Sequence, residues 1–249
     1  MLATAIIPAR FGSTRFPGKP LADQTGKPLI QHVVEQVRQA QSVHRIVVAT
    51  DDTRIADAVH AFQGEAVLTR PDHPNGTCRI AEAVEILALP ESDLVLNVQG
   101  DEPEIEPHVI DQLVHGLAED PDAPMATLAS PFADDEDPGN PNIVKLITDQ
   151  HGYALYFSRS LIPYHRDAED PHPAYLKHPG LYAYRKDFLM KYVTLPPTPL
   201  EQAEKLEQLR ALEHGYRIRI VHTQTRHHGI DTPEQYRDFV QRYRARLAQ

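Results

Sequence analysis

The chain has 249 residues, 41% of them hydrophobic, which is enough apolar material for the core of one large domain. Its formal net charge of −10 argues against a nucleic-acid partner, because such proteins need a basic face to neutralise phosphates. One cysteine excludes an internal disulfide framework and, with no signal-peptide pattern at the start, favours a cytoplasmic protein. No run of about 18 apolar residues occurs, so we expect no membrane insertion.

The first apolar run, residues 5–9, predicts a strand that leads directly into a basic loop. This loop is not a Walker A motif, because five residues separate Gly12 from Gly18 and Pro20 stands where the Mg²⁺-binding hydroxyl would be. A solvated turn and a phosphate-binding loop both remain open at this point. The cations and the hydroxyl that would serve phosphate binding are those of Arg10, Arg15, Lys19 and Ser13.

From residue 29 to residue 98, helical and strand spacings alternate along the chain. Alternation of this kind predicts a parallel sheet with helices on both faces. In such sheets ligands bind beyond the carboxyl ends of the strands, where the basic loop and the turn after residue 98 both lie. We predict helices at 29–41, 55–62 and 79–89 and strands at 45–50, 66–69 and 93–98.

The pattern changes near residue 123, where short strands follow one another without long helices between them. We therefore predict one Rossmann-like α/β domain, residues 1–249, with an inserted antiparallel layer at about 123–222. The predicted strands of the layer are 125–130, 142–148, 153–157 and 217–222, with an exposed loop at 166–173, and the predicted helices are 200–214 within it and 233–247 after it.

Two aspartates are candidates for a metal site. Asp101 ends a buried strand, where a carboxylate can hold Mg²⁺ against phosphates, but a turn aspartate or a helix N-cap would look the same. Asp231 precedes a helix start at Pro233, so capping is the safer interpretation, and a magnesium role stays open.

Other polar clusters have weaker signals. Residues 75–79 stand before a helix, so their amides and Arg79 could meet an anion or a base edge, or Thr77 could simply cap the helix. Cys78 has no histidine beside it and is expected to be a small packed side chain. The 14 histidines form no helical ligand pair, so we expect no zinc site. His178 and Tyr182 belong to a polar and aromatic strand that solvent could equally cover.

Taken together, these segments resemble the cytidylyltransferases that activate the eight-carbon sugar acid Kdo, the CMP-Kdo synthetase family. The resemblance runs nearly from end to end of the chain. It is carried by IPAR at 7–10, STR at 13–15, PGKP at 17–20, ATD at 49–51, NVQGDEP at 97–103, NPN at 140–142, YALYFSR at 153–159, HPGLY at 178–182, LE at 200–201, LEQLR at 206–210 and DTPE at 231–234.

The resemblance implies a fold of the nucleotide-diphospho-sugar transferase type and a reaction of CTP with Kdo. In that reaction the C2 hydroxyl of Kdo attacks the α-phosphate of CTP, giving CMP-Kdo for lipopolysaccharide biosynthesis and releasing pyrophosphate. It also implies a Mg²⁺-dependent, cytoplasmic homodimer.

The resemblance further implies roles for individual residues. Lys19, Asp101 and Asp231 would be the catalytic residues, and the two aspartates would hold Mg²⁺. The sets for the substrates are Arg10, Ser13, Arg15, Lys19, Arg79 and Gln99 for CTP, and Arg159, His178, Tyr182, Glu207 and Gln208 for the sugar acid, with Arg159 expected at its carboxylate.

The chain departs from the family pattern at two positions. Cys78 stands where a glutamate usually follows the Gly-Thr pair, and Pro179 replaces an aliphatic residue beside His178. Alternatives therefore remain open for the substrate: the amino-substituted sugar acid 8-amino-Kdo, or a sialic acid. A nucleotide-binding regulator without catalysis is the alternative from another class.

Overall fold

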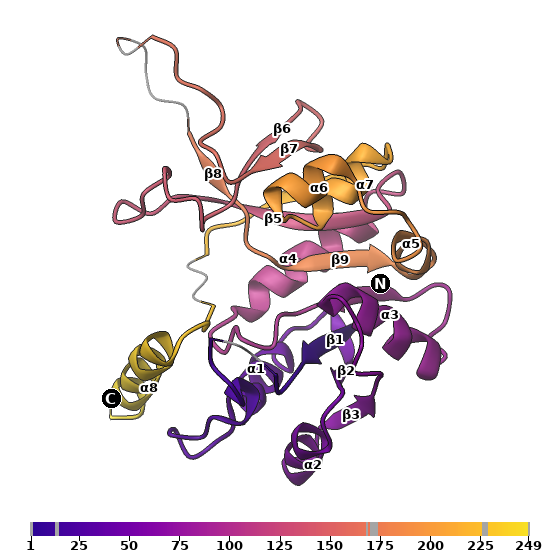
Figure 1. Cartoon of the computed structure of the whole chain (residues 1–249), viewed down its shortest axis with the longest axis vertical. Coiled ribbons are helices and arrows are strands. Elements are labelled where there is room, and N and C mark those ends of the chain that lie inside the picture. The colour runs from indigo at the N-terminus through magenta and orange to yellow at the C-terminus, as the bar shows by residue number, and fades with distance from the viewer. Residues whose placement is uncertain (1, 13–14, 168, 170–173, 226–228, 249) are drawn as a thin grey trace. The chain divides into compact units, whose positions relative to one another are not determined.

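The computed structural model describes residues 2–12, 15–167, 169, 174–225 and 229–248 (Figure 1). The chain divides into two compact units. We call residues 2–111 with 227–249 the terminal unit, and residues 112–226 the middle unit. The predicted inserted layer falls entirely within the middle unit. Among the described residues, no helix combines the length and the apolar character needed to cross a membrane.

The terminal unit contains a parallel sheet in the order β3-β2-β1-β4. Strand β1 lies at its centre, and Ile6 and Ile7 are fully buried because helices cover a parallel sheet on both faces. This alternation of strands and helices confirms the predicted α/β fold class. The elements are β1 (Ala3–Ala9), the 3-10 turn η1 (Lys19–Leu21), α1 (Leu29–Val37), β2 (Val43–Thr50), α2 (Thr53–Ala61), β3 (Glu65–Leu68), α3 (Gly76–Ile86) and β4 (Leu94–Asn97). Helix α4 (Pro107–Ala118) follows.

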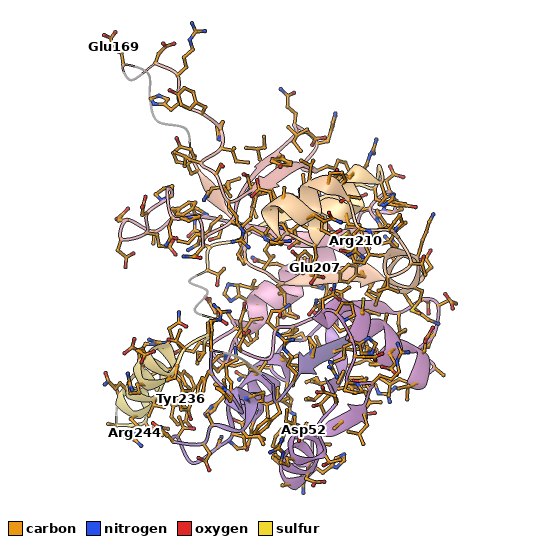
Figure 2. All side chains as sticks on the ribbon, in the orientation of Figure 1. Asp52, Glu169, Glu207, Arg210, Tyr236 and Arg244 are labelled. Atoms are coloured by element: carbon orange, nitrogen blue, oxygen red, sulfur yellow. The ribbon has the colours of Figure 1, made fainter. Side chains whose placement is uncertain are left out.

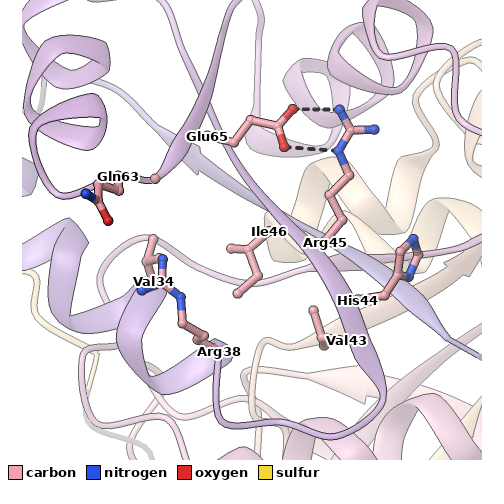
Figure 3. A pocket seen from close by; sticks show the side chains of 9 residues that line it. Val34, Arg38, Val43, His44, Arg45, Ile46, Gln63 and Glu65 are labelled. Atoms are coloured by element: carbon pink, nitrogen blue, oxygen red, sulfur yellow. Dashed lines mark hydrogen bonds and ion pairs between the residues drawn. The ribbon is translucent and has the colours of Figure 1, made fainter.

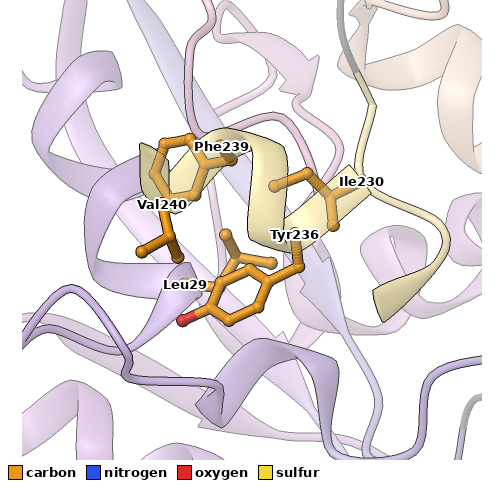
Figure 4. Packing of buried hydrophobic residues seen from close by; sticks show 5 residues of the cluster. All are labelled: Leu29, Ile230, Tyr236, Phe239 and Val240. Carbon is orange, nitrogen blue, oxygen red and sulfur yellow. The ribbon is translucent and has the colours of Figure 1, made fainter. Parts of the chain in front are cut away.

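The C-terminal helix α8 (Pro233–Leu247) returns to the terminal unit and packs on α1. Figure 4 shows the buried cluster that joins them, in which Leu29 of α1 meets Tyr236 and Phe239 of α8. Thr232 begins α8 with a capping box, since its side chain accepts from the Gln235 amide and the Gln235 side chain reaches back. The helix therefore starts at a sharply defined point, one residue after Asp231.

The middle unit is built around β5 (Met125–Pro131). This strand pairs antiparallel with β8 (Leu176–Lys177) and β9 (Tyr182–Arg185), but parallel with β10 (Ile218–His222). The predicted antiparallel layer is confirmed for β5 with β8 and β9. Strand β10 departs from it and runs parallel to β5, because three helices carry the chain across from β9 and return it in the direction of β5. The remaining elements are β6 (Lys145–Thr148), β7 (Ala154–Ser158), α5 (Lys186–Tyr192), α6 (Pro199–Glu204) and α7 (Gln208–Glu213).

The helix predicted at 200–214 is two helices, α6 and α7. Lys205 between them takes a left-handed backbone with φ of 55°, which ends α6. The two pieces then pack on each other, and Arg210 of α7 binds Glu201 of α6 through Nε at 2.8 Å. No glycine or proline marks this break, so the apolar spacing alone predicted one continuous helix. Part of the exposed loop predicted at 166–173 lies outside the described residues.

Candidate active site

Three side chains from distant parts of the sequence meet at the carboxyl edge of the terminal unit's sheet. The Nζ of Lys19 lies 2.7 Å from Oδ2 of Asp101 and 3.6 Å from Oδ1 of Asp231. The Lys19 side chain is 13% exposed, so its ammonium is largely enclosed by these partners. Strand ends at this edge are where α/β sheets bind ligands. The structure thus brings together the three residues predicted to be catalytic.

The local backbone explains how Lys19 reaches this point. Gly18 adopts φ of 70°, and a Cβ there would lie 3.1 Å from the Phe11 ring, so the turn needs glycine. This conformation starts the short turn η1, and Lys19 is its first residue. The chain reversal returns the basic loop toward the sheet edge from which it left.

Two hydrogen bonds of the Ile230 backbone link the segment before Asp231 to Asp101 and to Lys19. The Ile230 amide donates to the Asp101 carbonyl at 2.9 Å, and the Ile230 carbonyl accepts from Lys19 Nζ at 2.6 Å. Thr232, not Asp231, is the N-cap of α8, so the capping interpretation of Asp231 is wrong and its carboxylate is directed to Lys19 and Arg15 instead. Asp101 likewise lies well before Pro107, the first residue of α4, and does not cap that helix.

The charges around Asp101 decide how well this cluster fits a cation. Burial raises the pKa of Asp101, the carboxylates of Glu102 and Asp231 raise it further, and only Lys19 opposes them. Arg15 Nη2 lies 3.0 Å from Asp231 Oδ1 and is 65% exposed, so this pair is open to solvent. Two converging carboxylates fit Mg²⁺, which takes one or two protein carboxylates and keeps several waters. Within the described residues, no group of three or more His, Cys, Asp or Glu side chains could hold a metal.

The other residues predicted to bind CTP have separate surroundings. Arg10 is exposed just after β1, and Ser13 lies outside the described residues. Gln99 donates to Asn97 at 3.1 Å. Arg79 is 4% exposed, and its guanidinium binds Thr69 Oγ1 at 2.6 Å inside the protein.

Asp51 is a polar residue of this region to which the sequence assigned no role. Its Oδ2 lies 3.4 Å from Arg79 Nη2, while its Oδ1 is buried and meets no hydrogen-bonding partner among the described residues. Arg79 is therefore held by Thr69 and Asp51, and its role toward the nucleotide stays a prediction.

Asn75 caps α3 by accepting from the Cys78 amide, so the interpretation of Thr77 as the cap is wrong.

The middle unit holds the residues predicted for the sugar acid. Thr127 Oγ1 donates to the Leu181 carbonyl at 2.7 Å and lies 2.9 Å from His178 Nε2. A hydroxyl whose proton is already donated must accept from the ring, which places the imidazole proton on Nε2. Nδ1 of His178 is then the acceptor for Gln208 Nε2 at 3.5 Å. Thr127 thus orients the ring, and nothing in the sequence marked it beyond its place in an apolar strand.

Aromatic rings surround this polar group. The ring of His178 lies 4.9 Å from Phe157 and 5.4 Å from Tyr182, both at T-shaped angles. Burial, and then the Glu207 carboxylate, raise the pKa of Tyr182 well above its usual value, so its hydroxyl stays protonated. Figure 2 shows Glu207 with Arg210 at the start of α7. Four of the five residues predicted to bind the sugar acid therefore lie in one region of the middle unit: His178, Tyr182, Glu207 and Gln208.

Arg159 is bound differently from the other four. Its Nε donates to the Glu204 carbonyl at 2.7 Å and its Nη1 to the Pro141 carbonyl at 3.0 Å. Arg159 thus links the backbone at Glu204 to the backbone at Pro141. Its predicted contact with the sugar carboxylate remains a prediction.

Comparison with known proteins identifies the family. A model of the cytidylyltransferase family matches residues 4–220. The 3-deoxy-manno-octulosonate cytidylyltransferase of Syntrophotalea carbinolica is 52% identical over 241 residues, covering 94% of this chain and 95% of the relative. The relative of the same name in Geobacter sulfurreducens is 52% identical over 242 residues, covering 94% and 96%. The chain belongs to this family.

Solved structures agree with this membership. A CMP:2-keto-3-deoxy-manno-octonic acid synthetase complexed with CTP is 44% identical, covers 99% of this chain and 100% of its own, and superposes with a TM-score of 0.91. A cytidylyltransferase of Leptospira borgpetersenii, 15% identical with a TM-score of 0.62, shares the fold alone. The resemblance inferred from the sequence motifs, the α/β fold class and the assignment as a cytidylyltransferase are confirmed.

The terminal unit of this cytidylyltransferase also has a pocket that none of the predicted site residues line. It measures about 320 Å³ and lies near the amino ends of β2 and β3 (Figure 3). Arg45 on its wall binds Glu65 with two hydrogen bonds of 2.6 and 3.0 Å. None of the residues predicted to bind substrate lines it. The lining residues are Val34, Arg38, Val43, His44, Arg45, Ile46, Gln63, Gly64 and Glu65.

Proposed function

We propose that this protein transfers the cytidylyl group of CTP to Kdo, forming CMP-Kdo for lipopolysaccharide biosynthesis and releasing pyrophosphate. The C2 hydroxyl of Kdo attacks the α-phosphate, and the bond from that phosphorus to the oxygen shared with the β-phosphate breaks. The observation that carries the proposal is the convergence of Lys19, Asp101 and Asp231 at the sheet edge, in a chain over 50% identical to cytidylyltransferases named for this sugar acid.

The basic loop is proposed to hold the triphosphate of CTP. Lys19 is a nearly enclosed ammonium, and Arg10 and Arg15 are exposed guanidiniums on the same loop. Reactions of this kind need positioning and neutralisation of charge more than covalent help from the protein. The cations would stabilise charge that grows on the leaving pyrophosphate.

Asp101 and Asp231 are proposed to hold Mg²⁺. Two carboxylates already directed to one ammonium, one of them with a raised pKa, form a place where added positive charge is stabilising. When bound, Mg²⁺ would neutralise phosphate charge and lower the pKa of a nearby hydroxyl. Lys19 binds both carboxylates, so its ammonium and Mg²⁺ would together neutralise their negative charge.

Kdo is proposed to bind at the polar group of the middle unit. His178, Tyr182 and Gln208 offer hydrogen-bonding groups held in place by packed aromatic rings. Such rigid donors and acceptors suit a substrate rich in hydroxyl groups. Glu207 and Arg159 complete the proposed set.

A cytoplasmic homodimer is the proposed working form. Within the middle unit, Leu155 is 58% exposed and Tyr164 is 85% exposed, and large apolar side chains at the surface often mark an interface. A second copy of the chain would cover them. Light scattering across a concentration series would detect the dimer, and a monomer at every concentration would contradict it. The cytoplasmic location rests on the low cysteine content.

Pyrophosphate release tests the function. With CTP and Mg²⁺ present, we expect release with Kdo and little with 8-amino-Kdo or a sialic acid. Release with another acid but not with Kdo would overturn the substrate assignment. Binding of CTP without turnover of any acid would favour a regulator.

A further inference from the structure

The C-terminal helix α8 is tied to the turn that follows β4 at a second point, far from Asp231. Arg242 donates through Nε at 3.0 Å and Nη2 at 2.6 Å to Oε2 of Glu104. Arg246 donates through Nη2 at 2.5 Å to Oε1 of the same carboxylate. The two arginines are four residues apart and therefore lie on one face of the helix. The Glu104 carboxylate thus accepts hydrogen bonds from both guanidiniums.

This bridge differs from an ordinary surface ion pair. The Glu104 side chain is only 14% exposed, while most surface pairs contribute little because water screens them. Each of its oxygens has its own guanidinium, and bonds of this kind are directional. Removing the arginines would leave a mostly enclosed carboxylate without its charge partners.

The segment just before α8 and the second half of α8 therefore both bind the same short turn. At the start of the helix, the Ile230 amide bonds the Asp101 carbonyl, and Asp231 follows directly. Farther along, Arg242 and Arg246 bind Glu104, three residues after Asp101. Apolar packing on α1 also holds the helix, and the Glu104 bridge adds directional polar contacts to that packing. Both attachments join the turn that carries Asp101 to the segment that carries Asp231.

The same helix also holds the segment that follows the basic loop. The Gln24 amide donates to the Tyr236 hydroxyl at 2.8 Å, and Arg244 Nη2 donates to the Gln24 carbonyl at 2.8 Å. Figure 2 labels Tyr236 and Arg244 on α8. Phe16 packs on Tyr236 with ring centroids 5.6 Å apart. The chain on both sides of Lys19 is thus fixed to α8.

We infer that Glu104, Arg242 and Arg246 are positioning residues that hold Asp231 opposite Asp101 at Lys19. The inference rests on the proposed magnesium role of the two aspartates. None of the three touches Lys19 or the aspartate carboxylates, so they act through the helix and the turn. Partners that hydrogen-bond directly to metal ligands change metal affinity by about tenfold to a hundredfold when they are lost, and we take the lower figure because these three residues act one step farther from the ligands.

The test compares Arg242→Gln/Arg246→Gln with Arg237→Gln. Arg237 lies on the same helix, pairs with Glu234 three residues before it, and is 60% exposed, which makes it a matched control. Two quantities are measured: the Mg²⁺ concentration for half-maximal rate, and Mn²⁺ binding to the CTP-bound protein by electron paramagnetic resonance without Kdo. We expect both constants to rise about tenfold in the double variant, with the KM for Kdo unchanged, and no change in Arg237→Gln.

A charge exchange separates positioning from folding. Glu104→Arg alone should weaken Mn²⁺ binding, and adding Arg242→Glu should restore much of it by remaking one ion pair. A double arginine variant that unfolds more easily but keeps normal metal constants would overturn the inference. An equal loss of Mn²⁺ affinity in Arg237→Gln would overturn the inference as well.

Asp101→Asn and Asp231→Asn distinguish the two levels of the argument. If these variants weaken Mn²⁺ binding and the arginine variants do not, the positioning role alone is wrong. If neither set weakens it, the proposed magnesium role is wrong and the positioning role falls with it.

Discussion

The two proposed binding regions differ in how their polar groups are held. In the terminal unit, Lys19 of η1, Asp101 after β4 and Asp231 before α8 are charged groups, and the side chain of Asp231 is 43% exposed. In the middle unit, His178 is held on Nε2 by Thr127 and approached by Gln208, among aromatic rings. The first arrangement suits phosphates and a cation, and the second suits the hydroxyl groups of a sugar acid. The proposed division is therefore charge for CTP and fixed hydrogen bonds for most of Kdo.

The difference also appears in the energetics. Burial raises the pKa of Asp101, which means that its ionised form is destabilised in the folded protein. Tyr182 has a raised pKa as well, but its stable form is the neutral one, so it carries no such cost at neutral pH. A ligand cation would therefore stabilise the terminal unit's site, and the middle unit's site is already satisfied without one.

The largest expected effect is from Asp101→Asn, which removes charge and keeps the shape. We expect kcat to fall at least about a hundredfold, because a group that stabilises transition-state charge is lost. Steady-state pyrophosphate release measures it, and circular dichroism checks the fold. Asp122→Asn, at an exposed turn of the middle unit, is the control. Near-normal turnover in Asp101→Asn would remove this residue from the mechanism.

Lys19→Met tests whether the charged region serves CTP alone. We expect kcat/KM for CTP to fall about tenfold to a hundredfold, since a charge-assisted hydrogen bond is lost, while the KM for Kdo changes little. Initial rates at low CTP give the first value. Lys27→Met is the matched control, because that ammonium binds Glu35 at 2.7 Å. An unchanged rate at low CTP would contradict the phosphate-binding assignment.

Gln208→Leu tests whether the polar group of the middle unit serves Kdo and not CTP. Loss of one neutral hydrogen bond should raise the KM for Kdo about fivefold and leave the KM for CTP unchanged. Gln202→Leu, at an exposed position of α6, should change neither. If Gln208→Leu shifts CTP and Kdo equally, the division of labour between the two regions is wrong.

The smallest expected effect is on stability and concerns His32 beneath α8. Burial lowers the pKa of this imidazole below its usual 6.5, although Glu35 opposes the shift. The unfolded chain then binds the proton more readily than the folded one, so the free energy of unfolding should decrease as the pH falls through about 6.5. Urea titrations at several pH values measure this dependence. His32→Gln should reduce it, and an identical pH dependence in that variant would exclude His32 as its source.

The sequence alone determined the parts of this protein that depend on local order. Apolar spacing predicted the strands and helices of the terminal unit, and ordered motifs such as residues 7–10 and 97–103 identified the family. It also named Lys19, Asp101 and Asp231 as candidates. The elements and the family could be predicted because periodicity and short motifs depend on a few neighbouring residues, while the roles of the three candidates stay predictions.

Only the tertiary structure decided which of these candidates meet and what holds them. Lys19 binds a carboxylate 82 positions away and a carbonyl 211 positions away, and no local pattern records such a contact. The break at Lys205, the parallel pairing of β10 with β5 and the bridge from Glu104 to α8 were equally invisible in the sequence. Each depends on packing between segments that are far apart in the chain, and that packing overrides local preference.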